Sequence, residues 1–306
     1  MSASISSSTR YIGRFAPSPT GPLHFGSLIA ALASYLDAKA HGGQWLVRIE
    51  DIDETRCKPQ FADDILRTLR AFGLHWDGEV MIQSSRKSRY EEALSQLVAR
   101  GVTYACICSR REIADSAMFG LEGPVYAGTC RTAHHPGGGH AIRALTTDEP
   151  MRFVDRVQGV VEQRLQSQLG DFVIKRRDDL FSYQLAVVVD DTDQNISDVV
   201  RGADLIDSTT RQLHLQRLLG LPTPRYLHIP VATNEDGQKL SKQTLAPGIG
   251  AADTHLILQR ALQFLGQTVS ADAALASSPA LLAAAQRVWT VAAIPAARHR
   301  SLPGWP

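Results

Sequence analysis

With 306 residues, of which 44% are hydrophobic and 21% charged, the chain has the composition of a soluble globular protein with one large domain or two smaller ones. Its formal net charge of +1 gives no overall attraction to a polyanion, so any RNA contact has to come from local basic patches. Residues 1–10 lack the apolar stretch of a signal peptide, and no run of 18 apolar residues indicates a membrane span. Four cysteines, three of them clustered, favour a metal site in a reducing compartment, and the cytoplasm is the expected location.

The first predicted unit is a short strand, a rigid turn and a helix. Residues 11–16 are mostly apolar, and a turn rich in proline and glycine follows them. From Ser27 onward, apolar residues recur with the spacing of a buried helix face until a Gly-Gly pair ends the helix. The free N–H groups at the start of such a helix suit a phosphate, which would lie beside His24 and Gly26. Alternatively, His24 simply caps an ordinary strand-to-helix turn.

The next segments continue this alternation. QWLVRIEDID (44–53) predicts a buried parallel strand that ends at Glu50, on the edge where open α/β sheets bind ligands. Helices are predicted over 61–73 and 84–101, the second with Val98 among its inward-facing residues. Strands and helices in this order predict an α/β fold with a doubly wound parallel sheet.

Residues 103–150 break the alternation and predict an insertion with a small irregular fold. It contains Cys106-x-Cys108 and, after 21 intervening residues, Cys130. Thiolates at this density suit Zn²⁺, which takes four tetrahedral ligands. Spacing alone nominates three histidines as the fourth ligand: His134, His135 and His140. The alternative is that the three cysteines are small buried hydrophobic residues.

Beyond the insertion the pattern returns to that of the core. The expected elements are strands within 151–163, a buried strand at AVVVDD (186–191), a helix within 201–220, a strand at 226–232, a turn at 234–237, and Ala- and Leu-rich helices from about 250. The turn leads to the segment KLSKQ (239–243).

Two blocks carry a resemblance to a known family. HFGS (24–27) fits the HIGH signature of class I aminoacyl-tRNA synthetases, and KLSKQ resembles their KMSKS signature. The stretch RFAPSPTGPLHFGS is most similar to the glutamyl and glutaminyl branch, and the resemblance spans about residues 10–245. It implies a Rossmann-type catalytic domain in two halves, a zinc-binding insertion inside an acceptor-binding-like region, and a helical C-terminal region. The two halves of the catalytic domain would span residues 10–102 and 186–245. The zinc-binding insertion would span 103–150, within an acceptor-binding-like region of 103–185, and the helical C-terminal region would span 246–306.

The resemblance also implies a catalytic ATP site, with Mg²⁺ accompanying the triphosphate. Its residues would be His24, Gly26, Ser27, Lys239 and Lys242. The two lysines could stabilise the charge that develops on pyrophosphate, although an isolated KxxK is more commonly a solvated pair.

A glutamate pocket is implied as well, formed by Arg14, Phe15, Ala16, Pro17, Ser18, Glu50, Tyr183 and Arg201. Arginines suit the carboxylates of glutamate and Glu50 suits its ammonium, but which arginine takes the side-chain carboxylate is left open. For zinc, the resemblance points to Tyr126 as the fourth ligand, in a Cys-x-Cys…Tyr-x₃-Cys arrangement.

Residues 244–306 are too few for the large anticodon-binding module of full-length glutamyl-tRNA synthetases. Short members of the branch imply a different reaction: L-glutamate is activated by ATP without tRNA and passed to the cyclopentenediol of queuosine, at the wobble position of tRNA(Asp), with the anticodon loop in the active site. A monomer without membrane contact is expected. Two alternatives stay open: a truncated or partner-assisted enzyme that charges a tRNA 3′ end, and a non-catalytic RNA- or nucleotide-binding paralogue. The basic runs Arg110-Arg111 and 175–177 are candidate RNA contacts, although such runs are more often solvated faces.

Overall fold

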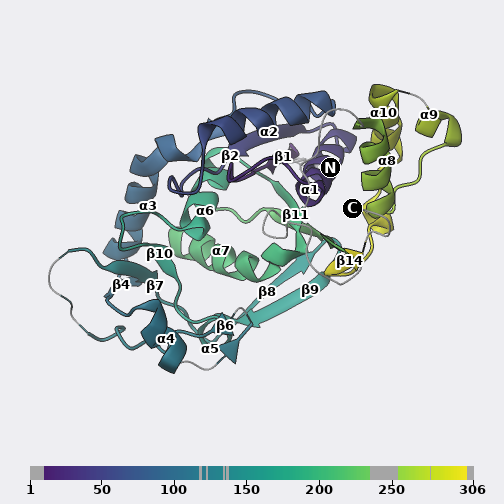
Figure 1. Cartoon of the computed structure of the whole chain (residues 1–306). Helices are drawn as coiled ribbons and strands as arrows, with labels where there is room; N and C mark the ends of the chain where they lie inside the picture. Colours follow the sequence, from purple (N-terminus) through teal and green to yellow (C-terminus); the bar gives the residue numbers. More distant parts are fainter. Residues whose placement is uncertain are drawn as a thin grey trace, which may run out of the picture.

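Five parallel strands form the centre of the molecule (Figure 1). The computed structural model describes residues 10–116, 119–121, 123–133, 135, 138–234, 254–275 and 277–301. Strand β1 (Ile12–Phe15) pairs in parallel with β2 (Gln44–Ile49), which pairs in parallel with β3 (Met81–Ile82). On the other side of β1 lies β11 (Asp198–Gly202), where the amide of Ser197 donates to the carbonyl of Ile12 over 2.9 Å, and β11 pairs in parallel with β12 (Arg225–Ile229). The predicted doubly wound parallel sheet is confirmed.

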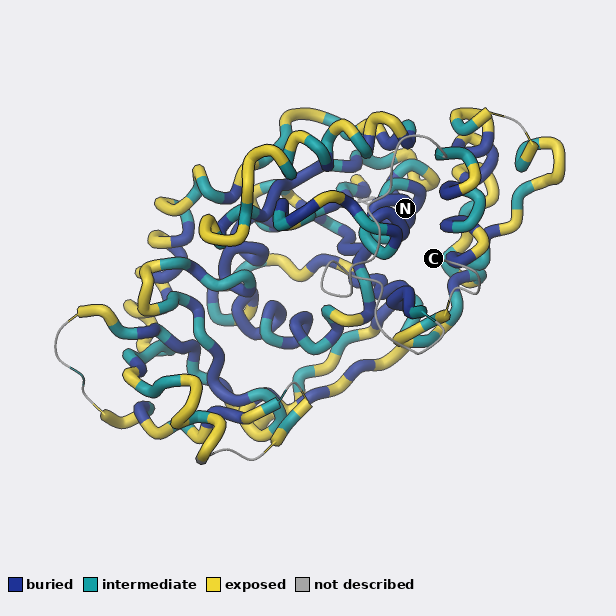
Figure 2. Tube along the Cα trace, viewed as in Figure 1, coloured by how far each residue is buried: buried dark blue, intermediate teal, exposed yellow. Residues whose placement is uncertain are grey.

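Helices cover both faces of these strands, and alternate strand residues face each layer. Val200 and Leu227 belong to the cluster packed by α1 (Phe25–Ala40), α2 (Pro59–Ala71), α8 (Thr254–Phe264) and α10 (Ser278–Val288). Their neighbours Val199 and Tyr226 face the other way, toward Leu213 of α7 (Ile206–Leu219). Helices α3 (Lys87–Ala99) and α6 (Tyr183–Asp193) pack with α7 in a further cluster. Figure 2 shows the buried inner faces of these helices.

The prediction of a buried strand at 186–191 is wrong, because these residues form the middle of α6. A run of valines between polar segments is typical of a parallel strand, but a helix buried on every side has no polar face to reveal its period. All residues from 184 to 191 are buried, and the Ser182 hydroxyl caps the helix by accepting from the amide of Leu185. The inward placement of Val98 is also wrong, since that side chain is 54% exposed.

The remaining predicted elements are present with small shifts. The strand expected at 226–232 is split at Pro230, which has no N–H to donate, into β12 and β13 (Val231–Thr233). Strand β13 pairs in parallel with β14 (His299–Ser301). The expected strands of 151–163 form a hairpin of β8 (Pro150–Asp155) and β9 (Gly159–Arg164), joined to β12 through β8. The turn at 234–237, apart from Asn234, and the KLSKQ segment lie outside the described residues.

The insertion forms a separate antiparallel sheet, at the lower left of Figure 1. Its strands are β4 (Thr103–Cys106), β7 (Ala141–Ala144) and β10 (Val173–Lys175), in the order β10-β7-β4. Short elements surround this sheet: α4 (Arg110–Ser116), β5 (Phe119–Gly120), β6 (Gly123–Pro124) and α5 (Leu165–Gln168).

The C-terminal helices lie against α1. Leu258 and Ala261 of α8 and Leu281 and Ala285 of α10 are fully buried in the cluster that α1 shares, as the Ala- and Leu-rich pattern predicts. A smaller helix, α9 (Ala271–Leu275), lies between α8 and α10 in the chain. In the described part of the chain, no helix has both the length and the apolar character needed to span a bilayer.

His228 of β12 and Asp155 of β8 form a buried pair that ties the hairpin to the parallel sheet. His228 Nδ1 lies 2.6 Å from Asp155 Oδ2, and the imidazole is fully buried. Burial lowers the pKa of His228 from 6.5 to about 4, despite the hydrogen bond to Asp155. At neutral pH the imidazole is therefore uncharged.

This pair predicts a loss of stability in mild acid. Between pH 6.5 and about 4 the unfolded chain binds a proton at residue 228 that the folded chain does not, so the free energy of unfolding should fall with pH, by up to about 3 kcal/mol. Asp155, whose pKa is lowered, adds to this loss at still lower pH. Urea unfolding from pH 7.5 to pH 5 would measure it. The variant His228→Gln should show a flatter profile over this range, and an unchanged slope would contradict the prediction.

Candidate active site and metal centre

A first cavity, of about 430 Å³, lies where β1 and β11 end and α1 begins. It collects predicted residues from four separate segments of the chain. Those in its wall are Arg14, Phe15, Ala16, Pro17, Ser18, His24, Gly26, Ser27, Tyr183 and Arg201. The wall also contains Thr20 and Leu23, which lie within RFAPSPTGPLHFGS but were assigned no role, and Val200 and Ile229, which no motif indicated. The carboxyl ends of parallel strands thus meet a helix start, which is where ligands bind in open α/β sheets.

The start of α1 is arranged for an anion. His24 is the N-cap residue, and its Nδ1 accepts a hydrogen bond from the amide of Ser27 over 3.3 Å. The Ser27 hydroxyl lies 2.9 Å from His24 Nε2. No acidic residue occupies the first turn of this 16-residue helix, so its positive end is not neutralised by its own side chains.

Arg14 is held by a buried carboxylate. Its Nε and Nη2 donate to the two carboxylate oxygens of Asp191 over 3.1 and 3.4 Å. Arg48 Nη2 also lies 2.8 Å from Asp191 and 3.2 Å from Glu50. Burial raises the pKa of Glu50 despite Arg48 and Arg14, whereas the same two arginines overcome burial and lower the pKa of Asp191. Asp191 therefore stays ionised and compensates the charge of Arg14.

Arg201 has a different environment. It is 5% exposed, and its Nε donates to His228 Nε2 over 3.1 Å. Its Nη2 donates to the Thr209 hydroxyl over 2.7 Å and to Gln212 Oε1 over 2.8 Å, and its Nη1 lies 3.4 Å from the Tyr183 hydroxyl. Within the described residues, these partners are all uncharged groups at neutral pH.

A second cavity, of about 690 Å³, adjoins the first and shares Ser18, Thr20 and Tyr183 with it. Glu50, predicted to surround the substrate with the others, lies in the wall of this second cavity. The cavity reaches the insertion at Cys108, and five arginines line it: Arg56, Arg110, Arg143, Arg176 and Arg177.

Two residues of the predicted basic runs lie elsewhere. Arg111 Nε is 3.7 Å from Asp115, and Lys175 Nζ is 3.1 Å from Glu91. Five arginines and three acidic residues, Glu50, Asp53 and Asp178, line the second cavity, which reaches from the insertion to the first cavity. Arg56 and Arg176 both pair with Asp53.

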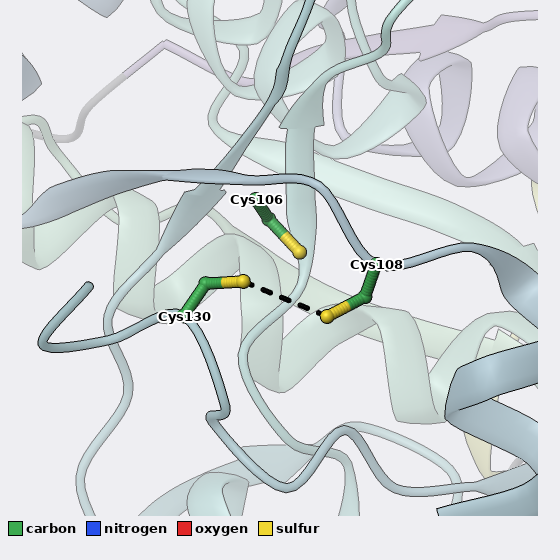
Figure 3. Close-up of side chains that lie close together, drawn as sticks. All are labelled: Cys106, Cys108 and Cys130. Atoms are coloured by element: carbon green, nitrogen blue, oxygen red, sulfur yellow. Dashed lines mark hydrogen bonds between the residues drawn. The ribbon is translucent and has the colours of Figure 1, made fainter. Parts of the chain in front are cut away.

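Three cysteines of the insertion converge (Figure 3). All their sulfur atoms lie within 4.8 Å of one another, and the Sγ atoms of Cys108 and Cys130 are 3.5 Å apart. The Tyr126 hydroxyl lies 3.5 Å from Cys106 Sγ and 3.6 Å from Cys108 Sγ. Two sulfurs bound to one tetrahedral zinc ion at ~2.3 Å lie about 3.8 Å apart, so this spacing fits such an ion.

The surroundings of Cys106 favour a thiolate, whereas burial and the neighbouring cysteines raise the pKa of Cys108 to about 11. Burial acts to raise the pKa of Cys106, but hydrogen bonds from Tyr126 and Arg143 lower it to about 7. The Arg143 guanidinium lies 3.9 Å from the centre of the Tyr126 ring. The rings of His135 and His140 meet edge to face with their centroids 6.0 Å apart, and neither belongs to the cluster in the described part of the chain. His134 lies outside the described residues.

The sequence did not predict the buried residues that hydrogen-bond to the side chains lining the cavities. Asp190 and Asp191 follow an apolar run, and this consecutive pair of acids was a usable signal for buried arginine partners. Gln212 and Asp155 carried no such signal, because their partners come from other elements.

The chain matches known proteins along most of its length. The family model described as "tRNA synthetases class I (E and Q), catalytic domain" matches residues 12–271. "Glutamyl-Q tRNA(Asp) synthetase" of Ectopseudomonas mendocina (strain ymp) is 50% identical over 290 residues, which cover 95% of this chain and 97% of that protein. The protein of the same name from Dechloromonas aromatica (strain RCB) is 53% identical over 288 residues, covering 93% of this chain and 96% of that protein.

A solved structure supports the fold independently. The glutamate-tRNA synthetase of Elizabethkingia anophelis aligns with a TM-score of 0.80 at 22% identity, covering 96% of this chain and 68% of that one. At this identity the likeness concerns the fold alone. The family match and the two close relatives show more: this chain belongs to the class I tRNA synthetases of the glutamate and glutamine branch, and among them to the glutamyl-Q tRNA(Asp) synthetases.

Proposed function

We propose that this chain activates L-glutamate with ATP in the absence of tRNA and transfers it to the cyclopentenediol of queuosine in the anticodon loop of tRNA(Asp). The observation that carries the proposal is a single cavity that joins an anion-binding helix start to two buried arginines. The identity of the acceptor comes from the close relatives, which are glutamyl-Q tRNA(Asp) synthetases by name. Because those relatives match over nearly their whole length, this function is favoured over charging of a tRNA 3′ end.

The reaction divides between the two cavities. In the first, the α-carboxylate of glutamate attacks the α-phosphate of ATP, forming glutamyl-adenylate and releasing pyrophosphate, with Mg²⁺ on the triphosphate. A hydroxyl of the acceptor then attacks the activated carbonyl, which forms an ester and releases AMP. Ser18, Thr20 and Tyr183 line both cavities, so an acceptor in the second reaches an adenylate in the first across this shared wall.

For ATP, we assign the phosphates to the start of α1. The amides of this turn and the positive helix end attract phosphate, and Gly26 has no side chain to obstruct it. His24 and Ser27, which hold each other at the helix start, orient the contact. Lys239 and Lys242 are assigned to the pyrophosphate on the motif alone, because they lie outside the described residues.

For glutamate, the electrostatics favour Arg201 as the receptor of the side-chain carboxylate. A buried charge without an ionised partner gains most from an incoming anion. Arg14 already has Asp191, so we assign it, with Ser18, to the glutamate backbone. Glu50 is assigned to the ammonium, reached through the wall between the two cavities.

For the tRNA, we assign the second cavity. Its arginines suit the phosphates of an anticodon loop, and Arg110, Arg176 and Arg177 come from the predicted basic runs. Such an enzyme acts as a monomer in the cytoplasm, where its tRNA is found.

For the metal, we propose a structural Zn²⁺ held by Cys106, Cys108, Cys130 and Tyr126. The three sulfurs and the phenol oxygen surround one point at spacings that fit. The ion would fix the loop that carries Tyr126 to β4, beside the second cavity.

The proposed acceptor is tested by charging three RNAs with labelled glutamate and ATP. Queuosine-containing tRNA(Asp) should be labelled, and the same tRNA without queuosine and tRNA(Glu) should not. The label should leave on mild alkaline treatment, as an ester does. Labelling of tRNA(Glu), or equal labelling with and without queuosine, would refute the proposal.

Lys242 is tested separately from the acceptor. The variant Lys242→Ala should lower ATP–pyrophosphate exchange about 100-fold or more, because a charge that stabilises the leaving pyrophosphate is lost. Binding of glutamate, measured by calorimetry, should remain. Exchange at the wild-type rate would remove Lys242 from its assigned role.

Tyr126 is tested by zinc retention. The variant Tyr126→Phe should lose zinc to a chelator faster than wild type, because one of four ligands is missing. His134→Ala and His135→Ala are matched controls and should retain zinc as wild type does. If a histidine variant loses zinc while Tyr126→Phe keeps it, that histidine is the fourth zinc ligand and not Tyr126.

A further inference from the structure

The two arginines of the first cavity are oriented by partners of opposite kinds. Asp191, an ionised acid, holds Arg14. Arg201 is equally buried, yet the side chains that accept its hydrogen bonds are an imidazole, a hydroxyl and an amide. Several hydrogen bonds thus hold Arg201 in place, and none of the described acidic residues forms an ion pair with it.

The side-chain amide of Gln212 turns its oxygen toward Arg201, because its nitrogen donates a hydrogen bond to Gln184. Its Oε1 lies 2.8 Å from Arg201 Nη2, and its Nε2 donates to Gln184 Oε1 over 3.0 Å. The Gln184 amide in turn donates to the Ser208 hydroxyl over 3.0 Å. This chain of amides presents a neutral oxygen to the guanidinium of Arg201. A glutamate side chain at position 212 has the same shape and would place a charged oxygen there.

His228 is kept neutral and in one tautomer. Its Nδ1 donates to Asp155, so its Nε2 carries a lone pair and accepts from Arg201 Nε. The groups that face the ring are Asp155 of β8, Arg201 of β11 and Thr209 of α7, with the Tyr226 ring stacked 6.0 Å away. The charge of Asp204 also acts on it. The imidazole of His228 therefore separates the carboxylate of Asp155 from the guanidinium of Arg201.

We propose that Gln212 and His228 are specificity-determining positioning residues, which orient Arg201 by neutral acceptors so that its charge remains available to select a carboxylate side chain over the corresponding amide. The inference rests on the proposed function, in which Arg201 receives the side-chain carboxylate of glutamate. A buried cation without a counter-ion binds an anion strongly, and a neutral amide only as one more hydrogen-bond partner. A carboxylate beside Arg201 would remove this difference.

The isosteric change Gln212→Glu tests this directly. ATP–pyrophosphate exchange is measured for wild type and variant with L-glutamate and with L-glutamine, without tRNA. The variant should lose about tenfold or more in kcat/KM for glutamate, through a higher KM, while kcat/KM for glutamine stays or rises. The KM for ATP should not change.

Gln216→Glu is the matched control. Gln216 lies one turn further along α7, is 2% exposed like Gln212, and donates to the Tyr226 hydroxyl without touching Arg201. It carries the same change of charge at the same depth, and it should keep the wild-type preference for glutamate. If both variants lose the preference for glutamate equally, a buried acid need not contact Arg201 to have this effect, and the inference is overturned.

A second pair of variants decides the matter if Gln212→Glu fails to fold, as judged by circular dichroism. In an Asp155→Asn background, which removes the neighbouring acid, His228→Gln and His228→Glu place a neutral or an anionic oxygen near Arg201. Only the second should lose the preference for glutamate. If wild type itself shows no exchange with glutamate, the proposed function fails. If wild type prefers glutamate and the anionic variants keep that preference, the function stands and this inference is wrong.

Discussion

The buried ion pairs at the carboxyl ends of β1 and β2 hold the active site together. Asp191 bridges Arg14 and Arg48, and Arg48 reaches Glu50, so β1, β2 and α6 meet in one network. Breaking such a network leaves charges without partners in a dry interior, which is strongly destabilising. Arg14 lines the first cavity and Glu50 the second, so the geometry of both cavities depends on three segments that are far apart in the chain.

The opening unit was predictable because its signals are local. A short strand, a turn rich in proline and glycine and an apolar helix stripe within residues 11–43 need no information from the rest of the chain. Most of the motif residues between Arg14 and Ser27 accordingly line one cavity. Helix α6 was not predictable in this way, because burial on every side removed the polar face that distinguishes a helix from a strand.

The charge state of each arginine was beyond the sequence for a different reason. In the sequence alone, nothing distinguishes the charge environment of Arg14 from that of Arg201. The partner of Arg14, Asp191, lies 177 residues away in the chain. His228 and Gln212, which contact Arg201, come from two other elements. Electrostatic differences of this kind arise only when the elements are packed. The choice between the two arginines was open at the level of the sequence, and our assignment of Arg201 to the side-chain carboxylate rests on which neighbours are ionised.

Asp37 near the end of α1 links the C-terminal region to the helix that begins at the proposed nucleotide site. This one carboxylate accepts from Trp289 Nε1 over 3.0 Å, from Arg156 Nη2 over 3.0 Å and from the Tyr11 hydroxyl. Helix α1 is a rod of 16 residues, about 24 Å long, with His24 at its other end. The C-terminal segment and the β8–β9 hairpin therefore anchor the end of α1 that lies opposite the proposed phosphate site. A substitution at Trp289, which lines neither cavity, would remove one of the anchors of this helix.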